Sequence, residues 1–550
     1  ISFIIFLMLT SRVNVLGRNI RYHQRYCLWN VNKMWKSSTV DTGSGDESTN
    51  EKSKVTFKKR KRPFRPRSML EKQLTKIKKD HREGSHFLKE LESLPKYPED
   101  NVYINNSIDL DKIEVYGFDF DFVIASYKPA LQGLIYDLVK QIMVEDKRYP
   151  KEFLDFQYDP TFAIRGLHFD CNQGVLLKLD STFNIHLETV FYGRQPLQPH
   201  QIYKRYPGLH LQKQYIEANI KHISDLFELS ECTILADIVQ FFADNDIKFD
   251  PSAVFRDVTE AVSIVHRHKL HAAIRDNIPV YVDEKPELGN LLNNIRSEGK
   301  STFLLTNNNY QNVDYLMKFI MPNLPYGLKT WHDLFDVVVT NADKPNFFTQ
   351  HDRPFRQLNE KRDGLLWAPI ENFERGEIYR DGCLTHMKKL TPWNERNVLY
   401  MGDHIKNDLI DAVKHWGWRT CAIIKELEDA VKCHNSIEYR KTLSYFEKIY
   451  MLSGKASREL PSDHHLIGKL EKEIAHNTRE LMKLRHPNFG CVFKSGTRET
   501  EIAHQLLRFA DLYTSRVENI LLLAGCTQFG PRRRLMPHDI SITPHLFMSN

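Results

Sequence analysis

The stretch IEVYGFDFDFVI, residues 113–124, decides the fold, because a β-prone run is followed at once by two carboxylates, Asp119 and Asp121. Behind it, apolar residues between Leu131 and Met143 recur at intervals of three and four, which predicts an amphipathic helix. A strand, a carboxylate-bearing loop and a helix, in this order, form the opening of an α/β unit.

Beyond this opening unit, the chain has four further strand-like runs, at 300–305, 335–340, 397–401 and 420–424. Thr306 and Asn307 follow the first of these runs, Lys344 follows the second, and Asp403 and Asp408 follow the third. In open parallel sheets, ligands bind outside the carboxyl ends of the strands. The sequence therefore predicts an α/β protein with a parallel sheet flanked by helices and a ligand site at one edge of that sheet.

The block from about 150 to 285 interrupts this alternation of strands and helices. Residues 162–191 alternate apolar and polar side chains around a turn at 172–174, which predicts β-hairpins. Residues 212–280 follow a helical pattern that breaks near Ser230 and Asp250. The block is interpreted as a mixed helical and β cap, inserted between the first strand and the rest of the sheet.

Six segments are predicted in chain order. The first two are a transit peptide and linker at 1–52 and a basic leader and lead-in helix at 53–100. A core segment with the first strand at 101–150, an inserted cap at 151–285, the rest of the core at 286–455 and a C-terminal helical extension at 456–550 follow. The lead-in helix, 68–96, is expected to be exposed. A second amphipathic stretch, 464–485, predicts a helix whose apolar face serves core packing or a subunit contact.

Charge is unevenly distributed along the 550 residues. The formal net charge is +7, but residues 1–100 hold 22 basic and 11 acidic residues, which leaves 55 basic and 59 acidic residues for 101–550. A slightly acidic body disfavours nucleic-acid binding by the folded part. The run KKRKR at 58–62 remains a candidate nuclear address or nucleic-acid patch.

The first forty residues carry basic residues and no acidic one before Asp41, which is typical of a mitochondrial transit peptide. A disordered basic tail, a secretory signal and a cytoplasmic location are the alternatives. The eight cysteines form no CxxC pair, as expected in a reducing compartment. No apolar run reaches the roughly 20 residues of a membrane span.

The candidate chemistry begins with Asp119 and Asp121, whose side chains project to the same side of an extended chain. One carboxylate can attack an electrophile while the other handles a proton, and attack on phosphorus gives an aspartyl-phosphate. Such an attack requires neutralisation of charge, which predicts a hard cation. Asp403 can supply a further carboxylate to Mg²⁺, which prefers oxygen ligands.

The remaining strand-end residues suit the same reaction. Thr306 and the backbone of Asn307 can donate hydrogen bonds to phosphoryl oxygens, and Lys344 adds a compact positive charge. Each motif alone has a plainer interpretation: a surface pair for the two aspartates, a helix cap for Thr306, and a turn for the segment from Asp403 to Asp408. Their order along successive strands favours phosphoryl transfer.

These motifs resemble those of the haloacid dehalogenase superfamily and, within it, the 5'-nucleotidase domain-containing family related to the cytosolic purine 5'-nucleotidase. The resemblance extends from about residue 112 to about residue 533. It rests on VYGFDFD (115–121), FAIRGLHFD (162–170), FLLTN (303–307), ADKP (342–345), YMGDH (400–404) and GWRT (417–420).

The resemblance implies a haloacid dehalogenase-like core with a cap, and a Mg²⁺-dependent hydrolysis of 5'-nucleoside monophosphates. It implies that Asp119 is the nucleophile and Asp121 the acid and base. Thr306, Asn307 and Lys344 then match phosphate-binding positions. The implied magnesium ligands are Asp119, the Asp121 carbonyl and Asp403, with Asp408 behind them.

Several positions depart from the family pattern. Lys406 and Val175 stand at positions where the purine enzyme binds an effector, and Asn308 replaces a common serine. These departures motivate an alternative function, a catalytically weak or inactive family member that acts as a scaffold or regulator. Arg165 fits two interpretations, a family position or a structural ion-pair partner. Related enzymes form dimers and tetramers, so a homo-oligomer is an open expectation.

Overall fold

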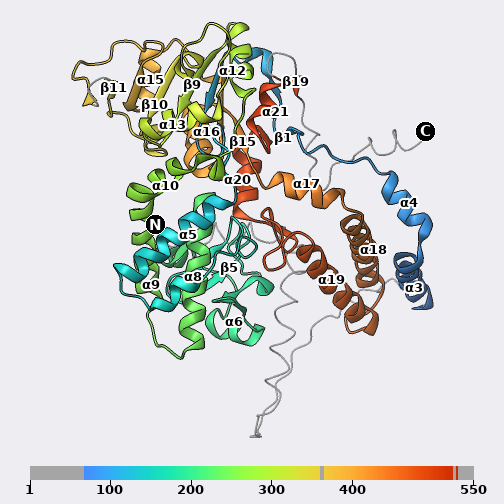
Figure 1. The fold of residues 1–550 in the computed structure, drawn as a ribbon. Coiled ribbons are helices and arrows are strands. Elements are labelled where there is room, and N and C mark those ends of the chain that lie inside the picture. Colours follow the sequence, from blue (N-terminus) through green and yellow to red (C-terminus); the bar gives the residue numbers. More distant parts are fainter. Residues whose placement is uncertain (1–66, 360–363, 524–527, 530–550) are drawn as a thin grey trace, which may run out of the picture. The chain divides into compact units, whose positions relative to one another are not determined.

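The structure is a computed structural model that describes residues 67–359, 364–523 and 528–529 (Figure 1). The predicted transit peptide and the basic run at 58–62 lie outside the described residues. The described residues all belong to one compact unit. The division of that unit into core, cap and extension stays a prediction.

All five expected strands are present and lie in one sheet (Figure 1). They are β3 (Val115–Phe118), β9 (Ser301–Leu305), β10 (Val337–Thr340), β14 (Val398–Gly402) and β15 (Arg419–Ile423). They run parallel in the spatial order β15, β14, β3, β9, β10, which places β3 in the middle. The α/β prediction with a parallel sheet flanked by helices is confirmed.

Further strands extend this sheet at both edges, so that it has ten strands among the described residues. β18 (Leu512–Thr514) runs parallel beside β15, and β13 (Ile378–Asp381) runs parallel beside β10. Short antiparallel strands close the edges: β1 (Tyr103–Ile104), β11 (Phe355–Asn359) and β12 (Gly364–Leu365). The edge strands were not predicted, because runs of two to five residues carry little periodicity.

The side chains of the central strands alternate between two hydrophobic clusters, one on each face of the sheet. Tyr116 and Phe118 of β3 belong to one cluster, which includes residues of α12 (Leu288–Ser297), α13 (Tyr310–Ile320) and α21 (Val517–Leu521). Val115 belongs to the other cluster. That face is covered by α14 (Asn346–Thr349), α15 (Leu384–Leu390), α16 (Asp411–Trp416) and α20 (Glu501–Phe509). A sheet buried on both faces explains the nearly continuous apolar runs in the sequence.

Close packing of neighbouring side chains explains why residue 117, in the middle of β3, is a glycine. It lies between Phe303 of β9 and Tyr400 of β14, its partners in the register. A Cβ at this position would lie 2.1 Å from the Cζ atom of Phe303. The ring of Phe303 is stacked with that of Tyr400, with centroids 6.0 Å apart, so the glycine makes room for an aromatic layer directly under the site-bearing strand.

The expected helix behind β3 is α5 (Ala130–Glu145), and the region between α5 and α12 carries a second, five-stranded sheet. Its strands are, in spatial order, β7 (Gln195–Pro196), β6 (Phe191–Tyr192), β5 (Val175–Leu177), β4 (His168–Asp170) and β8 (Ile220–His222). β4 and β5 form the predicted hairpin. This region, residues 151–285, is called the inserted region below.

Helices complete the inserted region. They are α6 (Pro199–Arg205), α7 (Lys213–Asn219), α8 (Leu229–Asp244), α9 (Pro251–Ile264), α10 (Leu270–Asp276) and α11 (Ile278–Tyr281). The predicted breaks agree with the helix starts, since α8 begins one residue before Ser230 and Asp250 is the N-cap of α9.

The last group of helices comprises α3 (Arg67–Glu83), α4 (Ser85–Ser93), α17 (Leu427–Asn435), α18 (Ile437–Glu459) and α19 (His465–Lys483). The lead-in helix differs from its prediction in two respects: it is divided at Gly84, and Leu70 and Leu74 are buried in a cluster with Ile449 and Leu470. Its apolar stripe therefore docks on α18 and α19 instead of being exposed. The helix predicted at 464–485 is α19, and its apolar face packs in this same cluster. Within the described part of the chain, no helix is long and apolar enough to cross a membrane.

Candidate functional site

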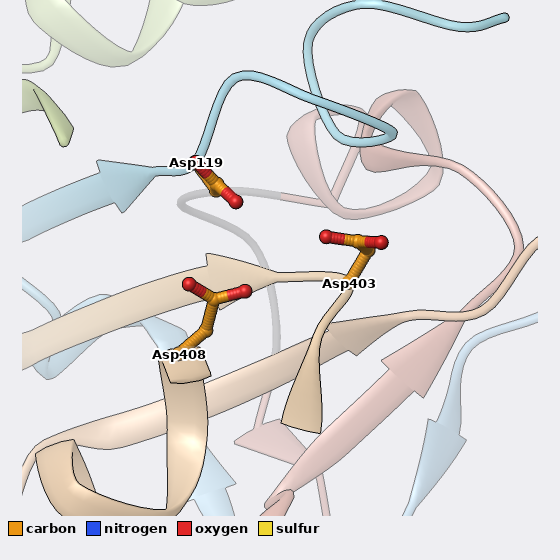
Figure 2. Close-up of side chains that lie close together, drawn as sticks. All are labelled: Asp119, Asp403 and Asp408. Atoms are coloured by element: carbon orange, nitrogen blue, oxygen red, sulfur yellow. The ribbon is translucent and has the colours of Figure 1, made fainter. Parts of the chain in front are cut away.

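Three carboxylates meet where β3 and β14 end (Figure 2). Asp119 follows β3, Asp403 follows β14, and Asp408 lies in η9 (Ile405–Ile410), the helical turn after β14. One oxygen from each lies within 4.8 Å of the others, and all three residues are buried. Figure 2 shows the three side chains pointing toward a common space. The parallel arrangement of β3 and β14 produces this convergence, because their carboxyl ends meet at one sheet edge.

Lys344 is the cation that contacts this cluster. Its Nζ lies 2.7 Å from Asp119 Oδ1 and 2.6 Å from Asp408 Oδ1. It also donates a hydrogen bond to the hydroxyl of Tyr400, at 3.0 Å. Although burial by itself would lower the pKa of Lys344, the charges of Asp119 and Asp408 raise it well above its ordinary value. The lysine therefore stays charged at neutral pH.

The loops after β9 and β10 hold Lys344 in place. Asn307 Oδ1 accepts a hydrogen bond from Lys344 N at 2.6 Å, and Asn307 Nδ2 donates to Lys344 O at 3.0 Å. Thr306 O accepts a hydrogen bond from Ala342 N, and Asn308 O accepts one from Asn341 N. Asn307 thus uses its side chain to position Lys344, while the contact of its backbone with a phosphoryl oxygen stays a prediction.

Thr306 is fully buried, and its Oγ1 accepts a hydrogen bond from Asn308 N at 3.0 Å. This bond fixes the turn that follows β9 and leaves the hydroxyl hydrogen available to a further acceptor. Thr306 is therefore placed at the same sheet edge as Asp119, as the strand order predicted.

Asp121 lies beside the cluster and is not one of its three carboxylates. Its Oδ1 accepts a hydrogen bond of 2.6 Å from the hydroxyl of Tyr127, and Asn308 Nδ2 lies 3.5 Å from both carboxylate oxygens. Burial raises the pKa of Asp121 to about 6, although the hydrogen bond from Tyr127 acts in the opposite direction. A carboxyl with such a pKa can both donate and accept a proton near neutral pH.

Burial also raises the pKa of Asp119, to about 8, although the nearby charge of Lys344 lowers it. The pKa of Asp403 is raised well above its ordinary value by burial and, next, by the charge of Asp225. Removal of a carboxylate from water disfavours its charged form, and adjacent carboxylates add repulsion. Without a bound cation, Asp119 and Asp403 therefore hold protons at a higher pH than ordinary carboxyl groups do.

Gly402 makes the close approach of Asp408 possible. A Cβ on residue 402 would lie 2.4 Å from Asp408 Cβ. Asp408 in turn accepts a hydrogen bond from His404 N through Oδ2, at 3.1 Å. The sequence predicted Asp408 as a supporting residue, and the structure places its carboxylate directly in the cluster, paired with Lys344.

Two partners of the site, Tyr127 and Tyr400, were not assigned from the sequence, and a third, Arg165, had two interpretations. Tyr127 binds Asp121, and Tyr400 binds Lys344. Arg165 donates a hydrogen bond to the Asp403 carbonyl at 3.2 Å and forms a two-point ion pair with Glu426, at 2.7 and 2.8 Å. The second interpretation of Arg165, a structural ion-pair partner, is the one that these contacts support. A local motif carries no signal for such pairs, because Arg165 and Glu426 are 261 residues apart.

The donor set fits a hard divalent cation. One oxygen from each of three buried carboxylates lies within 4.8 Å of the other two, and oxygen is the ligand type that Mg²⁺ and Ca²⁺ prefer. Asp119, Asp403 and Asp408 are the residues that would surround such an ion.

Comparisons with known proteins find relatives over most of the chain. The 5' nucleotidase family matches residues 102–541. A 5'-nucleotidase domain-containing protein of Dictyostelium discoideum is 36% identical over 462 residues, which cover 82% of this chain and 77% of that protein. The 5'-nucleotidase domain-containing protein 2 of Rattus norvegicus is 33% identical over 447 residues, and that of Homo sapiens is equally similar. Those alignments cover 80% of this chain, 80% of the rat protein and 85% of the human one.

Proposed function

Because this chain belongs to the 5' nucleotidase family, we propose that it releases phosphate from 5'-nucleoside monophosphates through an aspartyl-phosphate on Asp119, with Mg²⁺ as its cation. The core is then of the haloacid dehalogenase type. The observation that carries the proposal is the placement of Asp119 in a buried cluster with Lys344 and two further carboxylates. A mitochondrial location and a homo-oligomer remain predictions from the sequence.

The first step is attack of an Asp119 carboxylate oxygen on phosphorus, while the bond to the 5'-oxygen breaks. Asp121 gives its proton to that leaving oxygen and, as a carboxylate, then takes a proton from the water that hydrolyses the aspartyl-phosphate. When bound, the cation supplies positive charge that offsets repulsion between the carboxylates and a phosphate dianion. Lys344 and the Thr306 hydroxyl hold the phosphoryl oxygens, and Asn307 keeps Lys344 in position.

The direct test of this proposal is a panel of purine and pyrimidine 5'-mononucleotides, ribose and deoxyribose. We expect phosphate release that requires added Mg²⁺, stops when the metal is chelated, and returns when Mg²⁺ is restored. Nucleoside 3'-monophosphates are the control, since they present the same groups in the wrong position. If no phosphomonoester is hydrolysed while Mg²⁺ still raises the melting temperature, the scaffold or regulator function replaces this proposal.

A pH profile tests the role of Asp121. In Tyr127→Phe, the hydrogen bond that favours the charged form of Asp121 is lost, so the pKa of Asp121 rises above about 6. In a plot of the rate of phosphate release against pH, the part of the curve that reflects titration of Asp121 should move to higher pH by about 1 unit. Tyr149→Phe is the matched control, because Tyr149 makes a similar bond, 2.9 Å, to Asp257 in the inserted region. Curves that coincide in wild type and Tyr127→Phe would contradict this role.

A further inference from the structure

The main chain at Asp403 is held from outside the sheet. β14 ends at Gly402, so Asp403 is the first residue beyond the strand, and its carboxylate points toward the other two carboxylates of the cluster (Figure 2). The Asp403 carbonyl accepts a hydrogen bond of 3.2 Å from Nη1 of Arg165. Arg165 belongs to the inserted region, which therefore contacts the backbone of a residue whose side chain is in the candidate cation site.

The guanidinium group of Arg165 is fixed by Glu426, the N-cap residue of α17. Its Nε and Nη2 donate hydrogen bonds to the two carboxylate oxygens of Glu426, at 2.7 and 2.8 Å. Because the guanidinium is planar and its donors have fixed directions, this two-point pair determines where Nη1 points, which is at the Asp403 carbonyl. Only 2% of the Arg165 side chain is exposed, so these contacts are shielded from water.

A second contact joins the inserted region to the same loop. The hydroxyl of Ser224 lies 3.3 Å from His404 Nε2, in the next residue of the loop. The segment that carries Ser224 is paired with the segment that follows Arg165, through a hydrogen bond of 2.7 Å from Gly166 N to Ile223 O. One paired unit of the inserted region thus holds the loop at two successive residues.

The pair of Arg165 and Glu426 supplies direction to this loop, since its two charges are opposite and largely compensate each other. A hard cation such as Mg²⁺ requires its oxygen ligands at short distances and in near-octahedral directions. The carboxylate of Asp403 moves with its main chain, so a contact that fixes the main chain also fixes the ligand. Loss of such outer partners of metal ligands typically weakens metal binding by about 10–100-fold.

We propose that Arg165, held in its plane by Glu426, is a positioning residue of the cation site: by fixing the main chain at Asp403, it directs that carboxylate toward the divalent cation. The inserted region and the cation site are then coupled, because the affinity for the cation depends on a side chain that does not touch it. The proposal rests on the proposed function, since it takes the cluster of Asp119, Asp403 and Asp408 as the place of that cation.

The first test is Arg165→Lys in the full chain, because lysine keeps the positive charge and loses the planar arrangement of three donors. Mg²⁺ affinity is measured by calorimetric titration in the absence of substrate. We expect the dissociation constant for Mg²⁺ to rise at least roughly 10-fold, since Asp403 is no longer held in the direction that binding requires.

The matched control is Arg194→Lys, also in the inserted region. Arg194 forms the same kind of two-point pair, with Asp237 at 2.6 and 2.9 Å, and its Nη1 donates to Asp159 Oδ2 at 3.3 Å. The control variant therefore loses the same donor geometry, but none of these contacts involves the loop after β14. Its Mg²⁺ affinity should equal that of the wild type.

A second variant, Arg165→Met combined with Glu426→Met, separates the positioning role from charge and from the loss of a buried partner. Both charges are removed together, so no unpaired ion is left in the interior, and replacements of this kind are often neutral or stabilising. The net charge near the site is unchanged, while the donor to the Asp403 carbonyl is lost. We expect the dissociation constant for Mg²⁺ to rise as it does in Arg165→Lys.

An unchanged Mg²⁺ affinity in Arg165→Lys, or in the folded double variant, would overturn the inference alone. An equal loss of affinity in Arg194→Lys would also overturn it, since any loosening of the inserted region would then weaken binding. A wild-type chain that binds no Mg²⁺ would overturn both this inference and the metal dependence of the proposed function. Because binding is measured without substrate, these outcomes are distinct from a failure to hydrolyse mononucleotides.

Discussion

Phosphate release by Asp119→Asn is expected to fall by at least roughly 10³-fold, because the amide oxygen cannot act as the nucleophile that forms the aspartyl-phosphate. The substitution should leave the fold intact. The amide oxygen of the introduced asparagine can still accept the hydrogen bond that Asp119 Oδ1 receives from Phe120 N at 2.7 Å, and it can still face Lys344. The measurement is steady-state phosphate release at saturating Mg²⁺ and mononucleotide, with the melting temperature recorded in parallel.

Asp408→Asn is the control that separates a lost nucleophile from a lost charge. Asp408 contacts the same Nζ of Lys344, at 2.6 Å against 2.7 Å for Asp119, so both variants remove one negative charge next to one lysine. Asp408→Asn should still form an acid-stable, hydroxylamine-sensitive phosphoenzyme during turnover, whereas Asp119→Asn should form none. Equal activity losses with equal amounts of phosphoenzyme would show that Asp119 is not the nucleophile.

Removal of the Asp119 charge also changes the dependence of stability on pH. Burial raises the pKa of Asp119 to about 8, above the ordinary value of 3.8, so the native chain binds a proton more readily than the unfolded chain between these values. This group therefore contributes stability that is present at low pH and lost as pH rises toward about 8. In the absence of metal, Asp119→Asn should lose less stability than the wild type between pH 5 and pH 8.

The parallel sheet and the residues at its edge were predictable because the signal is local. Each strand is a short apolar run, and the polar residue that follows it is adjacent in sequence. Once the strands are parallel, their carboxyl ends must meet, so Asp119, Thr306, Lys344 and Asp403 share an edge whatever the detailed loop geometry. The order of strands across the sheet was not contained in those runs.

The finer roles depend on contacts between distant segments, which no local pattern reports. Asn307 binds the backbone of Lys344, 37 residues away, and this bond decides that its side chain positions the lysine. Tyr127 shares a loop with Asp121, but its hydroxyl reaches the carboxylate only because that loop folds back. The lead-in helix was predicted as exposed for the same reason, since its partners α18 and α19 lie more than 350 residues along the chain.

Lys344→Met is the second variant with a large expected effect, and its readout is stability instead of activity. Lys344 is almost completely buried, and its Nζ contacts Asp119, Asp408 and the Tyr400 hydroxyl. Methionine keeps much of the volume and removes the charge, which leaves buried carboxylates without their partner. Breaking a buried ion pair by removing one member costs about 3–5 kcal/mol. We expect the metal-free free energy of unfolding, measured by urea titration at pH 9, where Asp119 with its pKa of about 8 is ionised, to fall by that amount.

Lys318→Met is the matched control, because Lys318 forms an equally short contact, 2.6 Å, with Asp314, but its side chain is 69% exposed. A solvent-exposed pair of this kind contributes about 0–1 kcal/mol. Saturating Mg²⁺ should restore part of the stability lost in Lys344→Met and none of that lost in Lys318→Met, since a cation among Asp119, Asp403 and Asp408 supplies the charge that the lysine no longer does. Two results would contradict this role of Lys344: equal losses of the free energy of unfolding in the two variants, or no response of Lys344→Met to Mg²⁺. Either result would mean that the carboxylates of the cluster are protonated in the metal-free protein and that Lys344 does not hold them as anions.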